Sequence, residues 1–228
     1  MQNVRVFKPF GSLLFCVMWA IVMVGRSTND ADPDPDSGIV LDEGGPEDEV
    51  ARSTKNDLIW RRYRSLEQGL GTALNLAPGD LCNELGRYDC IDKVHLVALG
   101  GNDPLGAGMH EPMKSPTATT PVAIERLTLS ACDAAVTADA ARPVPLIFLD
   151  LDLSATAAPL DLEDELTSLA VGDTIISLYR RLHARDPLAE EQDTVLKIIT
   201  EDPEPMQART FALLSCFAIA STSESVFQ

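Results

Sequence analysis

The chain has 228 residues, and its 35 acidic side chains outnumber its 18 Lys and Arg side chains to give a formal net charge of −17. Nucleic acids and anionic membrane surfaces attract basic proteins, because cationic side chains displace counterions from phosphates. Partners of that kind are therefore excluded for a chain this acidic. The hydrophobic content of 45% is too high for a wholly disordered chain and suits one domain with appendages.

The amino-terminal segment has the pattern of an export signal. Arg5 and Lys8 precede an uncharged stretch, residues 9–25, that contains the apolar run LLFCVMWAIVMV. A basic region followed by an apolar region is typical of secretory signal peptides, and a stretch of this length is also the lower limit for a membrane-spanning helix. Residues 1–27 are therefore interpreted as a signal peptide, cleaved after Ser27, or as a retained membrane anchor.

This interpretation predicts an exported protein of the bacterial periplasm, or one anchored in the inner membrane and facing the periplasm. Contact with the membrane would be made only through residues 9–25, and only if the segment is not cleaved. An intracellular protein with a fortuitous apolar run is the less favoured alternative.

A change of composition follows the apolar segment. Residues 28–50 contain nine acidic residues and no Lys or Arg, together with several Pro and Gly. Such a stretch cannot bury enough apolar surface to offset the entropy of ordering it, and its like charges repel one another. We predict a disordered acidic linker there, with residues 51–228 forming the folded domain.

One calcium-binding pattern lies inside this linker. Asp32, Asp34, Asp36 and Glu43 occupy positions 1, 3, 5 and 12 of an EF-hand loop. Ser37, however, stands where glycine makes the sharp turn of such a loop, and no helical pattern flanks the segment. A solvated acidic linker is therefore favoured over a calcium site.

The folded domain is predicted to be mainly α, with about five helices and an irregular Gly-rich loop region. Apolar spacing, capping residues and prolines predict the helices at residues 57–70, 121–140, 161–184, 187–200 and 206–226. A short helix is expected at residues 78–80, and the apolar segment KVHLVAL at residues 93–99 predicts a strand.

The same spacing predicts which faces of the helices are buried. Leu66 and Leu70 should face inward in the first helix, whereas Arg61, Arg62 and Arg64 should form its solvated side. The run FALLSCFAIA is apolar on all sides and should form the most buried helix. The helix at residues 161–184 should bury six apolar side chains: Leu162, Leu166, Leu169, Ile176, Tyr179 and Leu182.

Cleavage of the export segment would leave four cysteines, Cys82, Cys90, Cys132 and Cys216. An even number in an exported protein predicts two disulfides, for which three connectivities exist. Seven residues, including a glycine, separate Cys82 from Cys90 and favour that pair. Cys132 and Cys216 would then join two predicted helices. Four reduced, buried cysteines are the alternative.

Two further groups of residues have side chains that can take part in chemistry. His110 and Glu111 follow a Gly-rich run and could bind a metal ion or act as a base, and Asp150 with Asp152 could act as an acid/base pair. No nucleotide-binding, zinc-protease, serine-hydrolase or haem-attachment motif accompanies them, so surface side chains are favoured in both places. No cofactor is predicted.

One resemblance concerns the carboxy-terminal part. Residues 178–191, LYRRLHARDPLAEE, and residues 223–227, SESVF, resemble part of a domain-of-unknown-function family found in exported proteins of planctomycetes and myxobacteria, often associated with c-type cytochromes. Its members have a tyrosine-led helix, an Arg-x-Pro turn with acidic residues, and an apolar helix ending near Glu-Phe-x-Phe. Here Ser225 replaces the first of those aromatic residues, and the haem-binding motif is absent. The resemblance implies a helical domain of the cell envelope and assigns no catalytic residue.

The sequence therefore favours an exported cell-envelope protein with no enzymatic activity, acting as an accessory or binding component beside another envelope protein. The alternative is an envelope enzyme or metal-binding protein that uses the Gly100–Glu111 loop or Asp150 and Asp152. A polar pocket shared by those two segments would favour the alternative.

Overall fold

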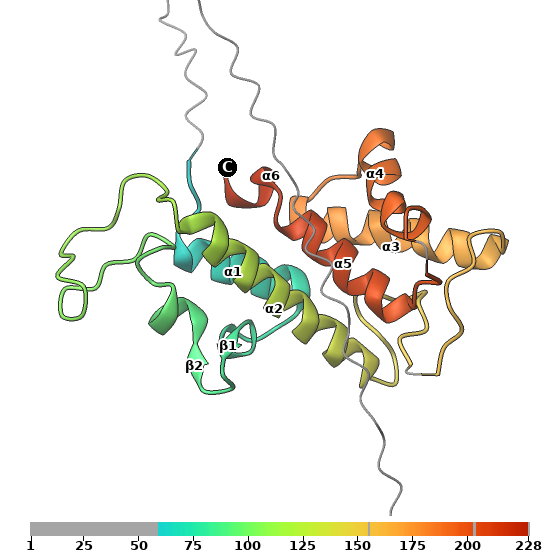
Figure 1. The fold of residues 1–228 in the computed structure, drawn as a ribbon, viewed down its shortest axis with the longest axis horizontal. Helices are drawn as coiled ribbons and strands as arrows, with labels where there is room; N and C mark the ends of the chain where they lie inside the picture. Colours follow the sequence, from blue (N-terminus) through green and yellow to red (C-terminus); the bar gives the residue numbers. More distant parts are fainter. Residues whose placement is uncertain (1–58, 155, 203, 228) are drawn as a thin grey trace, which may run out of the picture. The chain divides into compact units, whose positions relative to one another are not determined.

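The computed structural model describes residues 59–154, 156–202 and 204–227 (Figure 1). These residues belong to the second of two units into which the chain divides, Ser53–Gln228. The export segment, the acidic linker and the calcium pattern at Asp32, Asp34, Asp36 and Glu43 lie outside the described residues.

The domain is mainly helical, which confirms the predicted fold class. Its helices are α1 (Tyr63–Leu74), α2 (Thr120–Ala140), α3 (Glu165–His183), α4 (Ala189–Thr200), α5 (Ala208–Ala220) and the short α6 (Ser223–Val226). Between α1 and α2 lie a 3-10 turn η1 (Pro78–Asp80), two short antiparallel strands β1 (Asn83–Glu84) and β2 (Tyr88–Asp89), and a π-helical segment η2 (Cys90–Val94).

Two helices form the centre of the domain. These are α2 and α5, which pack against each other; α2 also packs against α1, and α5 against α3 and α4 (Figure 1). Small residues such as Ala131 and Ala212 are completely buried and let the backbones of the central pair approach closely. No residue between Phe211 and Ala220 is exposed, as the all-round apolar sequence of this segment predicts.

Both predicted disulfides are present. Cys132 of α2 is bonded to Cys216 of α5, with Cα atoms 5.8 Å apart, and both residues are completely buried. Cys82 is bonded to Cys90, with Cα atoms 5.4 Å apart, and closes the small β1–β2 turn. One disulfide therefore joins the two central helices, and the other holds a local loop.

The strand predicted at residues 93–99 is wrong. Asp89 instead caps η2, because its carboxylate accepts hydrogen bonds from the backbone N–H groups of Ile91 (2.8 Å) and Asp92 (2.7 Å). The Cys82–Cys90 disulfide fixes the start of the same segment. Local capping and this covalent link outweigh the strand preference of the apolar residues.

The predicted helix over residues 206–226 is divided by a turn. α5 ends at Ala220, and the hydroxyl of Thr222 donates to the carbonyl oxygen of Ile219 at 3.0 Å. Thr222 itself has an extended backbone conformation and is the N-cap residue immediately before α6. Hydroxyl side chains that bond to nearby carbonyl groups compete with helix continuation, and this accounts for the break.

The buried stripe predicted for α3 is correct only in part. Leu166 and Leu169 are 76% and 57% exposed, whereas the buried positions start at Val171 and continue through Ile175 and Leu178. Helical periodicity identifies amphipathic turns but does not show where the neighbouring helices stop. The first turns of α3 therefore lie outside the core.

A buried carboxylate holds the turn after α2. Asp139 accepts backbone hydrogen bonds from Leu146 (3.2 Å), Ile147 (2.7 Å) and Phe148 (3.1 Å), and a side-chain bond from Arg142 (2.6 Å). Burial by itself raises the pKa of Asp139, but these donors together outweigh burial and hold its pKa below the ordinary value. The turn that follows α2 is therefore organised around a charged group.

Candidate functional site

The structure does not bring the sequence-predicted site residues together. His110 and Glu111 are exposed on the loop before α2, which extends from the helices at the left of Figure 1. Asp150 and Asp152 are exposed before α3 and line a pocket of about 310 Å³ that does not include the other two residues.

Asp152 has a local structural role. Its carboxylate accepts a hydrogen bond from the backbone N–H of Ser154 at 2.9 Å, and this bond holds the pKa of Asp152 below its ordinary value. The carboxylate therefore remains ionised as a turn-forming acceptor and is poorly suited to act as an acid. Among residues 59–154, 156–202 and 204–227, no three His, Cys, Asp or Glu side chains are grouped to hold a metal ion.

A larger pocket of about 530 Å³ lies between β1 and α2. Arg126 lines it and forms an ion pair at 3.0 Å with Glu84, which also lines it. Glu84 is 2.9 Å from Nε2 of His95 as well. The positive charge in this pocket is therefore balanced within the protein.

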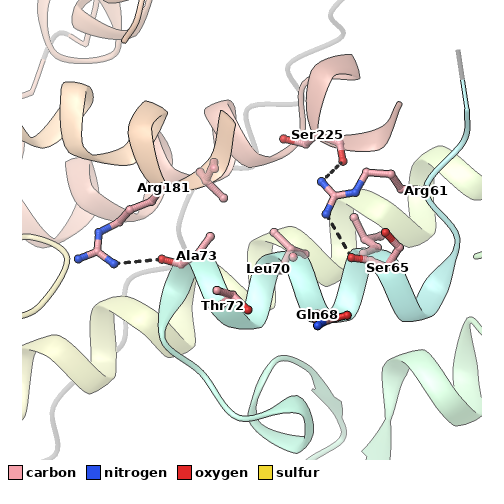
Figure 2. A pocket seen from close by; sticks show the side chains of 11 residues that line it. Arg61, Ser65, Gln68, Leu70, Thr72, Ala73, Arg181 and Ser225 are labelled. Carbon is pink, nitrogen blue, oxygen red and sulfur yellow. Dashed lines mark hydrogen bonds between the residues drawn. The ribbon is translucent and has the colours of Figure 1, made fainter. Parts of the chain in front are cut away.

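A third pocket differs in its charge. It has a volume of about 370 Å³ and lies between α1, the end of α3 and α6 (Figure 2). We call it the arginine groove, and its lining residues are Arg61, Ser65, Leu66, Gln68, Gly69, Leu70, Thr72, Ala73, Arg181, Leu182 and Ser225. The lining contains two arginines and no acidic residue.

Arg61 lies at one end of the groove and is held by backbone oxygens. Its Nη1 donates to the carbonyl of Ser225 and its Nη2 to the carbonyl of Ser65, each at 3.1 Å (Figure 2). The prediction that Arg61 belongs to the solvated side of the first helix is therefore wrong. Arg61 precedes α1, and its side chain extends forward along that helix and is half-buried. Arg62 and Arg64 are exposed, as predicted.

Gly69 makes this position of Arg61 possible. A Cβ atom at residue 69 would overlap Nη2 of Arg61, so only glycine leaves space for the guanidinium group against α1. Glycine inside a helix is about 1 kcal/mol less favourable than alanine. The close approach of the guanidinium group gives a physical reason for glycine at this position.

Arg181 lies at the other end of the groove. Its Nη1 donates to the carbonyl of Ala73 at 3.4 Å (Figure 2). Its Nη2 donates to the carbonyl of Leu146 at 2.6 Å. Ala73 is in the last turn of α1, where carbonyl groups have no partner within the helix. Arg181 therefore connects the end of α1 to the segment before α3.

Neither arginine of the groove forms an ion pair within the described residues. By contrast, Arg185 at the end of α3 donates to both carboxylate oxygens of Glu191 at 2.7 Å and to Glu224 at 2.9 and 2.6 Å. These bonds to Glu191 and then Glu224 raise the pKa of Arg185, while the bonds from Arg185 and from the backbone of Leu188 lower the pKa of Glu191 to about 2.

Sequence reasoning missed the groove because it placed all three arginines of the first helix in solvent. A glycine in the interior of an amphipathic helix, two turns after an arginine, was the available signal. The residues that complete the groove, Arg181 and Ser225, come from distant parts of the chain and carry no local pattern that connects them to α1.

Comparisons with known proteins give no further assignment, since no family model, no curated protein and no solved structure matches this chain. Within the described residues, no helix combines the length and the apolarity needed to cross a bilayer.

Proposed function

We propose that the protein is an exported, non-enzymatic helical protein of the bacterial cell envelope that serves as a binding component beside another envelope protein. The observation that carries this proposal is the pair of disulfides, one of which joins the central helices α2 and α5. Disulfides form and persist in oxidising compartments and are rare in the cytosol.

The amino-terminal sequence supports the same location. Residues 1–27 have the pattern of a signal peptide or anchor, so the body would reside in the periplasm, free or tethered at the inner membrane.

The arginine groove supports a binding role. Its lining offers guanidinium, hydroxyl and amide groups above apolar side chains, which suits recognition of a ligand. It contains no His, Asp or Glu, the side chains that most often act as general acids and bases.

Thiol trapping in intact cells tests the location. Cells are treated with a membrane-permeant alkylating reagent and fractionated, and each fraction is alkylated again in denaturant so that buried thiols also react. The protein is then analysed by mass spectrometry with and without reductant. We expect the chain in the periplasmic or membrane fraction, with Cys82, Cys90, Cys132 and Cys216 alkylated only after reduction. Alkylation of Cys16 shows in addition that the export segment is retained. A cytosolic chain whose four body cysteines react without reductant would contradict the proposal.

A further inference from the structure

We propose that the arginine groove binds an extended acidic segment of a partner protein, with one carboxylate at Arg61 and a second at Arg181. This inference rests on the proposed binding function and names the chemistry of its partner. It is carried by the charge, spacing and fixed position of the two guanidinium groups.

No acidic side chain among the described residues balances the charge of the groove. The arginines donate to four backbone carbonyl oxygens, and no lining residue is acidic. Nε of Arg61 is buried and has no hydrogen-bond partner among the described residues. A carboxylate beside each guanidinium group would supply the charge that Glu191 and Glu224 supply to Arg185.

The two guanidinium groups keep N–H groups that can donate to such a ligand. A guanidinium group has five N–H bonds, and each arginine of the groove uses two of its terminal nitrogens for one backbone bond apiece. Each of these nitrogens keeps one further N–H. A carboxylate can therefore approach either arginine without displacing its bonds to the backbone.

The spacing of the arginines defines the ligand. Arg61 is bonded to the carbonyl of Ser65 and Arg181 to that of Ala73, eight residues further along α1. At a rise of about 1.5 Å per residue these carbonyls are about 12 Å apart. An extended peptide advances about 3.3 Å per residue, so acidic residues three or four positions apart reach both arginines.

The walls of the groove suit a peptide main chain. Ser65, Gln68 and Thr72 lie along α1 between the two arginines and present hydroxyl and amide groups (Figure 2). The half-buried Leu182 contributes apolar surface beside them, and Leu66 and Leu70 are buried beneath the groove. Polar groups can bond to peptide N–H and C=O groups, and the apolar surface can contact small side chains.

The fixed position of Arg61 lowers the entropy lost on binding. Two carbonyl groups and the space above Gly69 hold its guanidinium group before a ligand arrives. The net charge of −17 limits the ligand to a few carboxylates, because a longer polyanion would be repelled by the rest of the protein. A segment with two acidic residues matches the two arginines.

Peptide binding to the full-length oxidised protein tests the inference. The probe is a blocked, fluorescent peptide with two aspartates separated by three alanines, and anisotropy is measured at low ionic strength. We expect saturable binding that weakens as salt is added. The same peptide with asparagines, and one with adjacent aspartates, should bind at least about tenfold more weakly.

Three variants locate the binding site. Arg61→Gln and Arg181→Gln should each weaken binding at least about tenfold, since each removes a charged donor pair. Gly69→Ala should have a similar effect, because it displaces Arg61 while both arginines remain. Arg62→Gln is the matched control, since Arg62 is exposed and does not line the groove, and it should bind as the unmodified chain does.

Circular dichroism of every variant separates loss of binding from loss of folding. No binding of the aspartate peptide, equal binding of the asparagine peptide, or equal binding by all folded variants would overturn the inference. Those results in a chain that is exported and disulfide-bonded would leave the proposed location standing, whereas a reduced cytosolic chain would remove the proposed function itself.

Discussion

The α2–α5 interior and the arginine groove use different interactions. The interior is apolar and covalently joined, with Cys132 and Cys216 completely buried between the helices. The groove lies between α1, α3 and α6, and its arginines are bonded to backbone carbonyls without an ion-pair partner among the described residues. Stability is therefore expected to depend chiefly on the interior, and ligand binding on the groove.

The largest predicted effect on stability comes from loss of the disulfide between α2 and α5. Cys132→Ala combined with Cys216→Ala opens a loop of 84 residues and should lower the unfolding free energy by about 4.5 kcal/mol, by chain entropy. The matched control, Cys82→Ala with Cys90→Ala, opens a loop of 8 residues and should lower it by about 2.5 kcal/mol. Urea unfolding measures both, and equal losses would contradict the central role of the α2–α5 link.

A smaller effect is expected from Asp139→Asn at the end of α2. The substitution removes the charge that three backbone N–H groups and Arg142 share, so the unfolding free energy should fall by about 2–3 kcal/mol. Asp133→Asn on the exposed side of the same helix is the control and should change the unfolding free energy by less than about 0.5 kcal/mol. Similar results for both variants would show that the buried carboxylate has no special role.

The pH dependence of stability should follow from lowered carboxylate pKa values. Glu191 has an ordinary pKa of 4.5 in the unfolded chain and about 2 in the folded protein. The stabilisation of the folded protein by Glu191 is therefore complete above about pH 4.5 and is lost as the pH falls through about 2. Glu191→Gln should flatten the stability profile in that interval. Its total effect on the unfolding free energy should be smaller than that of Asp139→Asn, because the Arg185–Glu191 pair is partly exposed and screened.

Urea unfolding at a series of pH values checks this order. Glu190→Gln is the control, because Glu190 is exposed beside Glu191 and is not bonded to Arg185. A profile for Glu191→Gln that coincides with that of the unmodified chain would show that the Arg185–Glu191 pair contributes nothing measurable.

The smallest effect on stability is expected in the groove. Gly69→Ala favours the helix by about 1 kcal/mol, but displacement of Arg61 loses two hydrogen bonds of similar total size. The net change in unfolding free energy should stay below about 1 kcal/mol, measured by urea unfolding. If Gly69→Ala lowered the unfolding free energy as much as Asp139→Asn does, the groove would be needed for stability. The groove and the α2–α5 interior would then not have the different roles proposed for them.

The sequence predicted features that depend on neighbours along the chain. Prolines and apolar spacing located α2, and the short separation of Cys82 from Cys90 predicted both disulfide pairs correctly. The KVHLVAL segment was predicted wrongly because capping by Asp89 and a disulfide override a weak strand preference.

Contacts between residues that are far apart in the sequence could not be predicted from such local patterns. The carbonyl partners of Arg61 and Arg181 include Ser225 and Leu146, which are far from those arginines in the sequence. Apolar spacing gives the side of a helix that is buried, but it does not give the residue at which the neighbouring helices begin. For this reason Leu166 and Leu169 were predicted to be buried and are exposed.

Hydrogen exchange followed by mass spectrometry, with and without the aspartate peptide, tests the contrast between the two regions most directly. We predict the slowest exchange in α2 and α5, where the disulfide joins buried helices. Added peptide should increase protection only around residues 61–73, 181–182 and 225, which line the groove. Fast exchange in α2 and α5, or peptide-induced protection confined to other segments, would contradict this account.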